Sequence, residues 1–227
     1  NEYKIPYERL VLIHVRDDQY RNDKNRKDYR NSNINKYIES IKYLIENNYF
    51  VMRVGRRPSN KIYFEHDNFL DYSSLDIQED NLDIFLMKKT KFFVGTQSGI
   101  LDLAQLFNKP ILQTNMVEIF SKYPIKINDR GIFKKIKKKG EFLSISDYVK
   151  LNYRYHNPSN DLNDLIFYEN TEEELLLSVK EFLDIQKNPT LTFNQNKFNQ
   201  FILNEHKKHF NQNPHELFTE YDSLKLI

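Results

Sequence analysis

Short apolar runs alternate along this chain with segments of helical periodicity, and this alternation limits the folds that it can adopt. The first run, residues 9–15, leaves little room for a polar face and predicts a strand buried on both sides. Residues 34–45 then carry apolar side chains at the spacing of an amphipathic helix, which Asn33 is placed to cap. Buried strands separated by helices are typical of a parallel sheet covered on both faces.

The same pattern continues through most of the chain. Further strands are predicted at residues 49–54, 91–94 and 111–113, and further helices at residues 81–88, 98–107 and 172–186. Residues 62–72 give a weaker signal, and residues 115–170 are expected to be irregular. We therefore predict an α/β fold with a Rossmann-like parallel sheet over residues 1–188 and a helical tail over residues 189–227.

Composition excludes several classes of protein. Hydrophobic residues make up 39% of the chain, which is enough for a sizeable core, and the absence of cysteine excludes disulfides and thiol catalysis. A net charge of +2 excludes a polycation. No apolar run is long enough to span a bilayer and no signal peptide opens the chain, so we expect a cytoplasmic protein. Because the first residue is Asn1, we also expect a segment cut from a longer protein.

The segment His14-Val15-Arg16-Asp17 stands where a ligand site is expected, directly after the first strand. Open parallel sheets bind ligands at the carboxyl ends of their strands. The planar guanidinium of Arg16 would suit a diphosphate there. His14 alternates toward the same side, although a packed, hydrogen-bonded histidine is the alternative. The charges that follow, Arg21, Arg26 and Arg30 among them, predict a solvated loop.

A second candidate site is the turn Gly95-Thr96-Gln97-Ser98-Gly99, between a predicted strand and a predicted helix. Such a turn presents free backbone N–H groups and the positive end of the helix dipole to an anion. Its glycines would let a bulky anion approach, and its hydroxyls would add donors. The alternative is an ordinary helix start with Ser98 as the cap and nothing bound.

These segments form part of an ordered set of motifs. The set comprises His14-Val15-Arg16-Asp17, Tyr29-Arg30-Asn31, Met52-Arg53-Val54-Gly55, residues 82–86 and residues 93–99. In this order they resemble a family of bacterial glycosyltransferases associated with surface-polysaccharide synthesis. The strand end and the turn are also similar to the donor domain of O-fucosyltransferase-like and other GT-B enzymes. The resemblance covers roughly residues 9–148.

The resemblance implies the donor-binding half of a GT-B glycosyltransferase, which would transfer a sugar from a nucleotide-diphosphate donor to a glycan or lipid-linked acceptor. It implies that Arg16 is catalytic because it neutralises the leaving diphosphate, and that Asp83 binds the ribose or base. The implied donor- and phosphate-binding residues are His14, Asp17, Arg53, Gly95, Thr96, Gln97, Ser98 and Gly99. Alternatives stay open for Asp83, as a surface acid, and for Arg53, as a salt bridge that fixes the next loop. Neither cofactor nor metal is expected, and an N-terminal domain or partner chain would supply the rest.

The lysines at 134, 135 and 137–139 form a basic patch, represented by Lys134 and Lys135. A solvated loop, an anionic membrane surface or lipid-linked acceptor, and nucleic acid are the possible interpretations. We expect no nucleic acid, because aromatic residues do not interleave with the lysines in the sequence. Peripheral contact with the inner membrane remains an option.

A different class of function also fits the chain: a non-catalytic nucleotide-binding or assembly module of a larger protein. Such a module would dock through the lysines and the tail, whose Phe198, Phe201 and Ile202 share one potential helical face.

Overall fold

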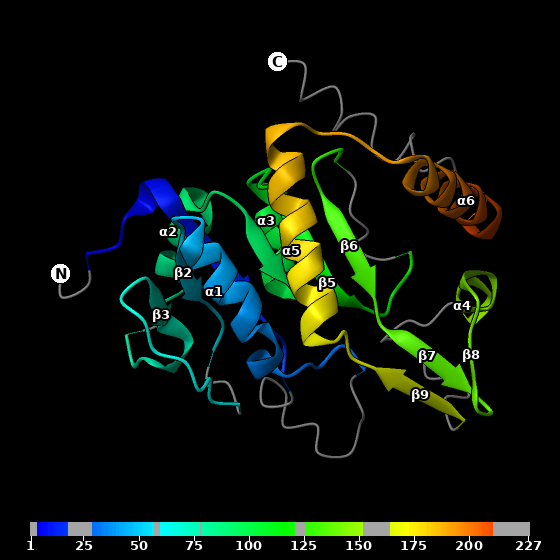
Figure 1. The fold of residues 1–227 in the computed structure, drawn as a ribbon, viewed down its shortest axis with the longest axis horizontal. Coiled ribbons are helices and arrows are strands. Elements are labelled where there is room, and N and C mark those ends of the chain that lie inside the picture. The colour runs from blue at the N-terminus through cyan, green and yellow to red at the C-terminus, as the bar shows by residue number, and fades with distance from the viewer. Residues whose placement is uncertain are drawn as a thin grey trace. The chain divides into compact units, whose positions relative to one another are not determined.

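The computed structural model describes residues 4–17, 29–56, 60–77, 79–120, 126–151 and 164–210. Within these residues the main element is a six-stranded sheet in the order β3-β2-β1-β4-β5-β6, and every neighbouring pair is parallel (Figure 1). The strands are β1 (Leu10–His14), β2 (Phe50–Arg53), β3 (Phe69–Asp71), β4 (Phe93–Gly95), β5 (Ile111–Met116) and β6 (Arg130–Phe133). This is a doubly wound, Rossmann-like order, so the predicted fold class is confirmed.

Helices cover both faces of this sheet (Figure 1). One face carries α1 (Ile38–Glu46) and α5 (Glu172–Lys187), and the other carries α2 (Asp80–Lys89) and α3 (Gly99–Leu106). Successive residues of β1 alternate between the two cores: Val11 and Ile13 pack with α1 and α5, whereas Leu10 and Leu12 pack with α2 and α3. This alternation explains the continuous apolar run in the sequence, because both faces of the strand are buried.

The ends of the predicted helices follow from local hydrogen bonds. Asn33 caps the short 3-10 helix η3 (Ile34–Tyr37), which leads into α1, by accepting from the backbone N–H of Asn35. Asn48, just beyond the end of α1, has a φ of 65°. Thr171 and Glu174 form a capping box at the start of α5. Two further 3-10 helices are η1 (Tyr7–Arg9) and η4 (Tyr72–Ser74).

The prediction of an irregular segment over residues 115–170 is wrong for its described parts. Beyond β6 lies a small antiparallel sheet in the order β8-β7-β9, together with α4 (Ile145–Leu151) (Figure 1). Its strands are β7 (Lys135–Lys138), β8 (Glu141–Phe142) and β9 (Leu165–Tyr168). Lys139 and Gly140 join β7 to β8 with φ values of 51° and 89°, the geometry of a tight hairpin turn.

By its internal contacts the chain divides into a unit Asn1–Asn188 and a unit Pro189–Ile227. The second unit contains α6 (Phe193–Phe210), so the predicted helical tail is confirmed there, and residues 211–227 lie outside the described residues. None of the helices in the described part of the chain has the length and apolar character needed to cross a bilayer.

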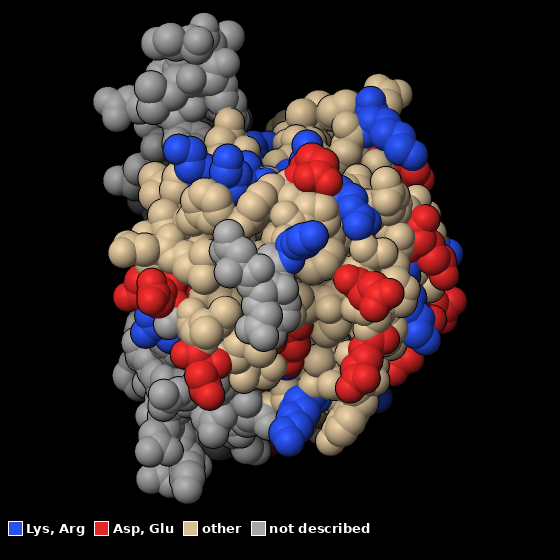
Figure 2. All heavy atoms as spheres, turned by 90° about the vertical axis from the view of Figure 1, so that its left-hand side faces the viewer, with Lys and Arg blue, Asp and Glu red and all other residues tan. Residues whose placement is uncertain are grey.

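The surface reflects the near balance of charges in the sequence. On the face that holds α2 and β3, basic side chains mix with acidic ones rather than gathering into a field of one sign (Figure 2).

Candidate functional site

The strand order reverses between β1 and β4, and the predicted site segments meet at this reversal. His14, the last residue of β1, is the register partner of Gly95, the last residue of β4. The chain then leaves β4 for α3 on one face, whereas the segment after β1 leads to α1 on the other. Doubly wound sheets bind their ligands in the crevice that such a divergence creates. The structure therefore brings together two segments whose proximity the sequence alone did not establish.

Two hydrogen bonds join the segments after β1 and β4. The backbone N–H of Arg16 donates to Oγ1 of Thr96 at 2.9 Å, and the backbone N–H of Thr96 donates to the carbonyl of His14 at 3.1 Å. Thr96 is fully buried. Its hydroxyl, which the resemblance assigns to the phosphate, thus fixes the backbone that carries Arg16.

Gly95 and Gly99 occupy different surroundings. A Cβ on Gly95 would come within 2.5 Å of the carbonyl oxygen of His14 and 2.8 Å of the ring of Phe93. Gly95 is therefore required by the close approach of the protein's own chain. A Cβ on Gly99 would meet nothing within 4 Å, so this position, the first of α3, stands beside open space.

Ser98 holds the N-cap position of α3, with extended backbone and without a side-chain capping bond. The alternative role of Ser98 as the helix cap is therefore confirmed in position, but its side chain makes no capping bond. Its phosphate-binding role stays a prediction. The positive end of the α3 dipole adjoins the open position at Gly99.

The side-chain amide of Gln97 forms hydrogen bonds with the segment after β5. Its Oε1 accepts from the backbone N–H groups of Val117 and Glu118 at 2.8 and 2.9 Å, and its Nε2 donates to the carbonyl of Glu118 at 2.8 Å. Gln97 is 1% exposed. These contacts make it a residue that positions the turn, and its predicted contact with the donor would have to come from its backbone.

Arg16 and Asp17 lie just after β1. Arg16 is half-buried, and its carbonyl accepts from the backbone N–H of Ser32 at 2.9 Å, which joins the segment after β1 to the segment before η3. Asp17 is buried and accepts from the backbone N–H of Asn60 at 3.4 Å. Arg21 and Arg26, which the sequence places in this loop, lie outside the described residues.

His14 is held as a neutral ring. Its Nδ1 lies 3.0 Å from the carbonyl of Val54, and because a carbonyl only accepts, Nδ1 carries the proton. Burial lowers the pKa of His14 to about 4; the hydrogen bond to Val54 opposes this shift, whereas the charges of Arg53 and Arg16 add to it. Gly55, with a φ of 128°, leaves room for the ring, since a Cβ there would lie 2.8 Å from Nδ1. At neutral pH His14 thus offers a ligand a hydrogen-bond acceptor rather than a positive charge.

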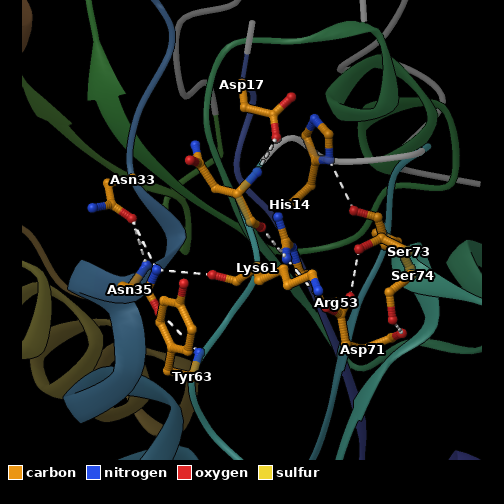
Figure 3. Close-up of polar contacts among 12 residues, drawn as sticks. His14, Asp17, Asn33, Asn35, Arg53, Lys61, Tyr63, Asp71, Ser73 and Ser74 are labelled. Carbon is orange, nitrogen blue, oxygen red and sulfur yellow. Dashed lines mark hydrogen bonds and ion pairs between the residues drawn. The ribbon is translucent and has the colours of Figure 1, made fainter. Parts of the chain in front are cut away.

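Arg53 forms the salt bridge that the sequence left open as its alternative role. It is 1% exposed, and its Nη1 lies 3.2 Å from Oδ2 of Asp71 and 3.0 Å from the carbonyl of Asn60. The hydroxyl of Ser73 donates to the other carboxylate oxygen of Asp71 (Figure 3). These contacts tie the ends of β2 and β3 to the next loop. A contact of Arg53 with phosphate stays a prediction.

Asp83 lies in the first turn of α2, at a different strand end from Arg16. Burial raises its pKa, while the positive charge of Arg56 and a hydrogen bond from Tyr72 lower it. Arg56 also pairs with Asp80, so the start of α2 gathers several charges. The surface-acid alternative underestimates how far Asp83 is buried, and its role at the ribose stays a prediction.

The lysine run is not the solvated loop that the sequence suggested. Lys134 is 4% exposed, and its Nζ donates to the carbonyl of Asn31 at 2.6 Å, which joins the end of β6 to the segment after β1. Lys135 belongs to β7 and pairs with Glu174 at 2.5 Å. The run is therefore a strand whose lysines have separate environments.

A buried polar network beside β5 escaped the sequence analysis. Asn115 and Asn170 exchange two hydrogen bonds of 2.7 Å, each from a backbone N–H to the other's Oδ1. The amide of Asn115 also donates to the hydroxyl of Tyr37, which lies 2.7 Å from Oγ1 of Thr114. Asn115 has a φ of 51° and stands where the register of β5 with β6 shifts. The polar residues Gln113, Thr114 and Asn115 within a fully buried strand are the sequence signal of this bulge.

The described residues contain no group of three or more histidine, aspartate or glutamate side chains placed to hold a metal ion.

Comparison with known proteins finds structural likeness at low sequence identity. No protein-family model matches the chain, and no curated protein matches it. Among solved structures, it resembles the dodecameric iron-containing heptosyltransferase TibC in complex with ADP-D-β-D-heptose, at 16% identity and a TM-score of 0.45 over 80% of this chain. A second TibC structure, a bacterial iron-containing dodecameric glycosyltransferase from enterotoxigenic E. coli, matches at 13% identity and a TM-score of 0.43, also over 80% of this chain. The chain spans about half the length of these structures, 45% and 46%.

Proposed function

We propose that this chain binds a nucleotide-diphosphate sugar and serves as the donor-binding domain of a glycosyltransferase of GT-B type. The observation that carries the proposal is the meeting of Arg16 with the Gly95-to-Gly99 turn at the reversal of the strand order. Segments 80 residues apart are joined there by the hydroxyl of Thr96. The ordered motifs that resemble bacterial surface-polysaccharide glycosyltransferases include both segments.

In this proposal Arg16 faces the diphosphate that leaves when the anomeric carbon is attacked. Negative charge develops on the diphosphate, so fixed positive groups lower the barrier most effectively. Arg16 would supply a full charge, and the first turn of α3 would supply backbone N–H groups beside the open position at Gly99. Neutral His14 would accept a hydrogen bond from a hydroxyl of the donor.

The proposed reaction needs no metal, because the protein supplies the positive groups. The acceptor, a glycan or a lipid-linked sugar, and the group that deprotonates it would come from a second domain or a partner chain. The surface-polysaccharide context rests on the motif resemblance.

Thermal unfolding against GDP, UDP, ADP, CMP and dTDP tests the donor site. A ligand at a hundred times its Kd stabilises a protein by about 2.7 kcal/mol, which at this size raises Tm by about 5–10 °C. We expect one diphosphate to raise Tm of the unmodified chain and to lose most of that effect in Arg16→Ala. Arg9→Ala is the matched control, since Arg9 directly precedes the opposite end of β1 and bonds Asn48 and Asn68. The rise in Tm that the ligand causes is compared between each variant and the unmodified chain, so a change in the Tm without ligand does not affect the result.

Two results would contradict the proposal. An equal shift in Arg16→Ala and the unmodified chain would remove Arg16 from the site. A lack of any shift, with nucleotide diphosphates and with their sugar conjugates, would favour the non-catalytic assembly module instead.

A further inference from the structure

One face of the small antiparallel sheet combines cationic and apolar side chains. Register partners on neighbouring strands project to the same side, and Lys137 pairs with both Phe142 and Ile166 while Lys135 pairs with Tyr168. We call these five residues the β7 face. Phe142, Ile166 and Tyr168 expose 55%, 57% and 39% of their surfaces. The sheet lies beyond the end of β6, to one side of the main sheet (Figure 1).

The opposite side of the same sheet is turned toward the protein. Ile136 is 2% exposed, and Phe167 stacks on Tyr29 with ring centroids 4.0 Å apart. The exposed apolar side chains of the β7 face are therefore not needed to anchor the sheet, which already has a buried side.

The charge on this sheet is predominantly positive. Residues 135–139 hold four lysines and no acid, and Lys138 and Lys139 are exposed where the hairpin turns. Lys135 pairs with Glu174. The acids of the sheet's strands and their immediate flanks are Glu141, at the turn, and Asp164 and Glu169, on either side of β9, of which Glu169 pairs with Lys36 at 3.4 Å. This differs from the face over α2 and β3, where the two signs mix (Figure 2).

We propose that the β7 face binds the surface of an anionic lipid bilayer. Exposed aliphatic and aromatic side chains enter the boundary between headgroups and acyl chains, while neighbouring lysines remain at the level of the phosphates. Lysines near an anionic leaflet each add to the attraction. Ile166 and Phe142, beside Lys137, have this arrangement, and the contact requires no helix that crosses the membrane.

Single-stranded nucleic acid is the competing partner, because the fold places aromatic rings beside lysines that are separate from them in the sequence. Bases need ring faces on which to stack. Here the ammonium of Lys137 lies over both rings, 4.5 Å from the centroid of Phe142 and 5.4 Å from that of Tyr168. Ile166, the most exposed apolar residue of the face, cannot stack with a base. Lipid therefore fits the face better.

Co-sedimentation with vesicles tests this proposal on the full 227-residue chain. We expect the chain to sediment with phosphatidylcholine vesicles that contain 30% phosphatidylserine, and less in 0.5 M salt or with phosphatidylcholine alone. One lysine at an anionic surface corresponds to about a fivefold change in partitioning, the loss expected for Lys137→Gln. Ile166→Ser should weaken partitioning by about tenfold, because the lost side chain no longer enters the bilayer.

Two matched variants control for general effects. Leu177→Ser removes an apolar side chain of nearly the same exposure, 56%, from α5. Lys180→Gln removes a lysine that also lies over an aromatic ring, 5.2 Å from the centroid of Tyr43. Both should partition like the unmodified chain, and thermal unfolding of all four variants checks that each is folded.

Several outcomes would overturn the proposal. They are equal sedimentation with neutral and anionic vesicles, losses as large in the two control variants, and anionic binding that Lys137→Gln and Ile166→Ser leave unchanged. Binding of single-stranded homopolymer RNA that these two substitutions abolish, without vesicle binding, would assign the face to nucleic acid.

Discussion

Two arginines lie at the carboxyl ends of neighbouring strands of the main sheet, Arg53 at the end of β2 and Arg16 just after β1, and their surroundings differ. After β2 and β3, side chains bind one another: Arg53 pairs with Asp71, which accepts from Ser73. After β1 and β4, the two hydrogen bonds between Thr96 and the segment His14–Arg16 join the loops through backbone groups and one hydroxyl.

Under the proposed function, this difference separates fold stability from ligand binding among the carboxyl ends of one sheet. Arg53 is 1% exposed and supplies its charge to a carboxylate of the protein itself. Arg16 is half-buried, and its backbone is fixed independently of its guanidinium. The first region is thus expected to respond to substitution mainly in folding, and the second mainly in ligand binding.

Arg53→Met should give the largest effect and is the strongest test of this comparison. It leaves the carboxylate of Asp71, whose side chain is 18% exposed, without its cation, and breaking a buried pair in this way costs about 3–5 kcal/mol. Arg16→Met should change the free energy of unfolding by less than about 1 kcal/mol, because the side chain is only half-buried. Urea denaturation of both variants measures the contrast. Equal losses would mean that both arginines are structural.

The sequence could not distinguish these arginines, because the distinguishing partner is distant. Asp71 lies 18 residues after Arg53, on a strand whose apolar pattern is weak. The sequence therefore left a salt bridge of Arg53 open as an alternative to ligand binding, without identifying its partner. The strands β1, β2, β4 and β5 were predictable because each is buried on both faces. In β7 only Ile136 is buried, and the other three positions are lysines. The sequence therefore shows no alternation of apolar and polar residues that would predict this strand.

Gly95→Ala should give the next largest effect, compared with Gly99→Ala as its control. The added Cβ at position 95 would lie 2.5 Å from a backbone oxygen, which cannot move without disturbing β1. Overpacking of this kind costs about 1–3 kcal/mol. Gly99→Ala meets open space and should be neutral or slightly stabilising. If both variants unfolded at the same urea concentration, the close approach of β4 to β1 would not constrain Gly95.

The pH dependence of stability should report on His14. Its pKa is about 4 in the folded chain and 6.5 in the unfolded chain, so between these values the unfolded state binds more protons. The contribution of neutral His14 to the free energy of unfolding is therefore complete above pH 6.5 and is lost as the pH falls toward 4. By pH 5 the loss reaches about 2 kcal/mol.

His14→Asn is the variant that isolates this titration, since its amide can still donate to Val54 but does not titrate. Denaturation at pH 7.5, 6 and 5 should show a smaller decline for the variant than for the unmodified chain. Parallel declines would indicate that the pKa of His14 is the same in the folded and unfolded chains.

The sequence predicts the separate segments of the candidate site, but it does not predict the contacts between them. A strand end at Arg16 and a strand-to-helix turn at Gly95 follow from local patterns, whereas their adjacency depends on the strand order. Gln97 bonds a segment 20 and 21 residues away, and Asn115 bonds Asn170 across 55 residues. Such partners leave no local periodicity, so sequence reasoning assigned Gln97 to the ligand and did not find the asparagine pair.

Thr96→Val should cost less stability than Arg53→Met or Gly95→Ala, and it is the sharpest test of how the two loops are joined. Valine keeps the shape of the buried side chain but removes the acceptor for the backbone N–H of Arg16, which costs about 1–3 kcal/mol when the donor stays buried and about 1 kcal/mol when water reaches it. Because Arg16 is half-buried, we expect the lower value, measured by urea denaturation. Thr96→Ser, which retains the hydroxyl, should recover most of the nucleotide-induced rise in Tm that Thr96→Val loses. If valine and serine bound nucleotide equally well, the hydroxyl would stabilise the fold without placing Arg16, and the separation between the two regions would be less complete than their contacts indicate.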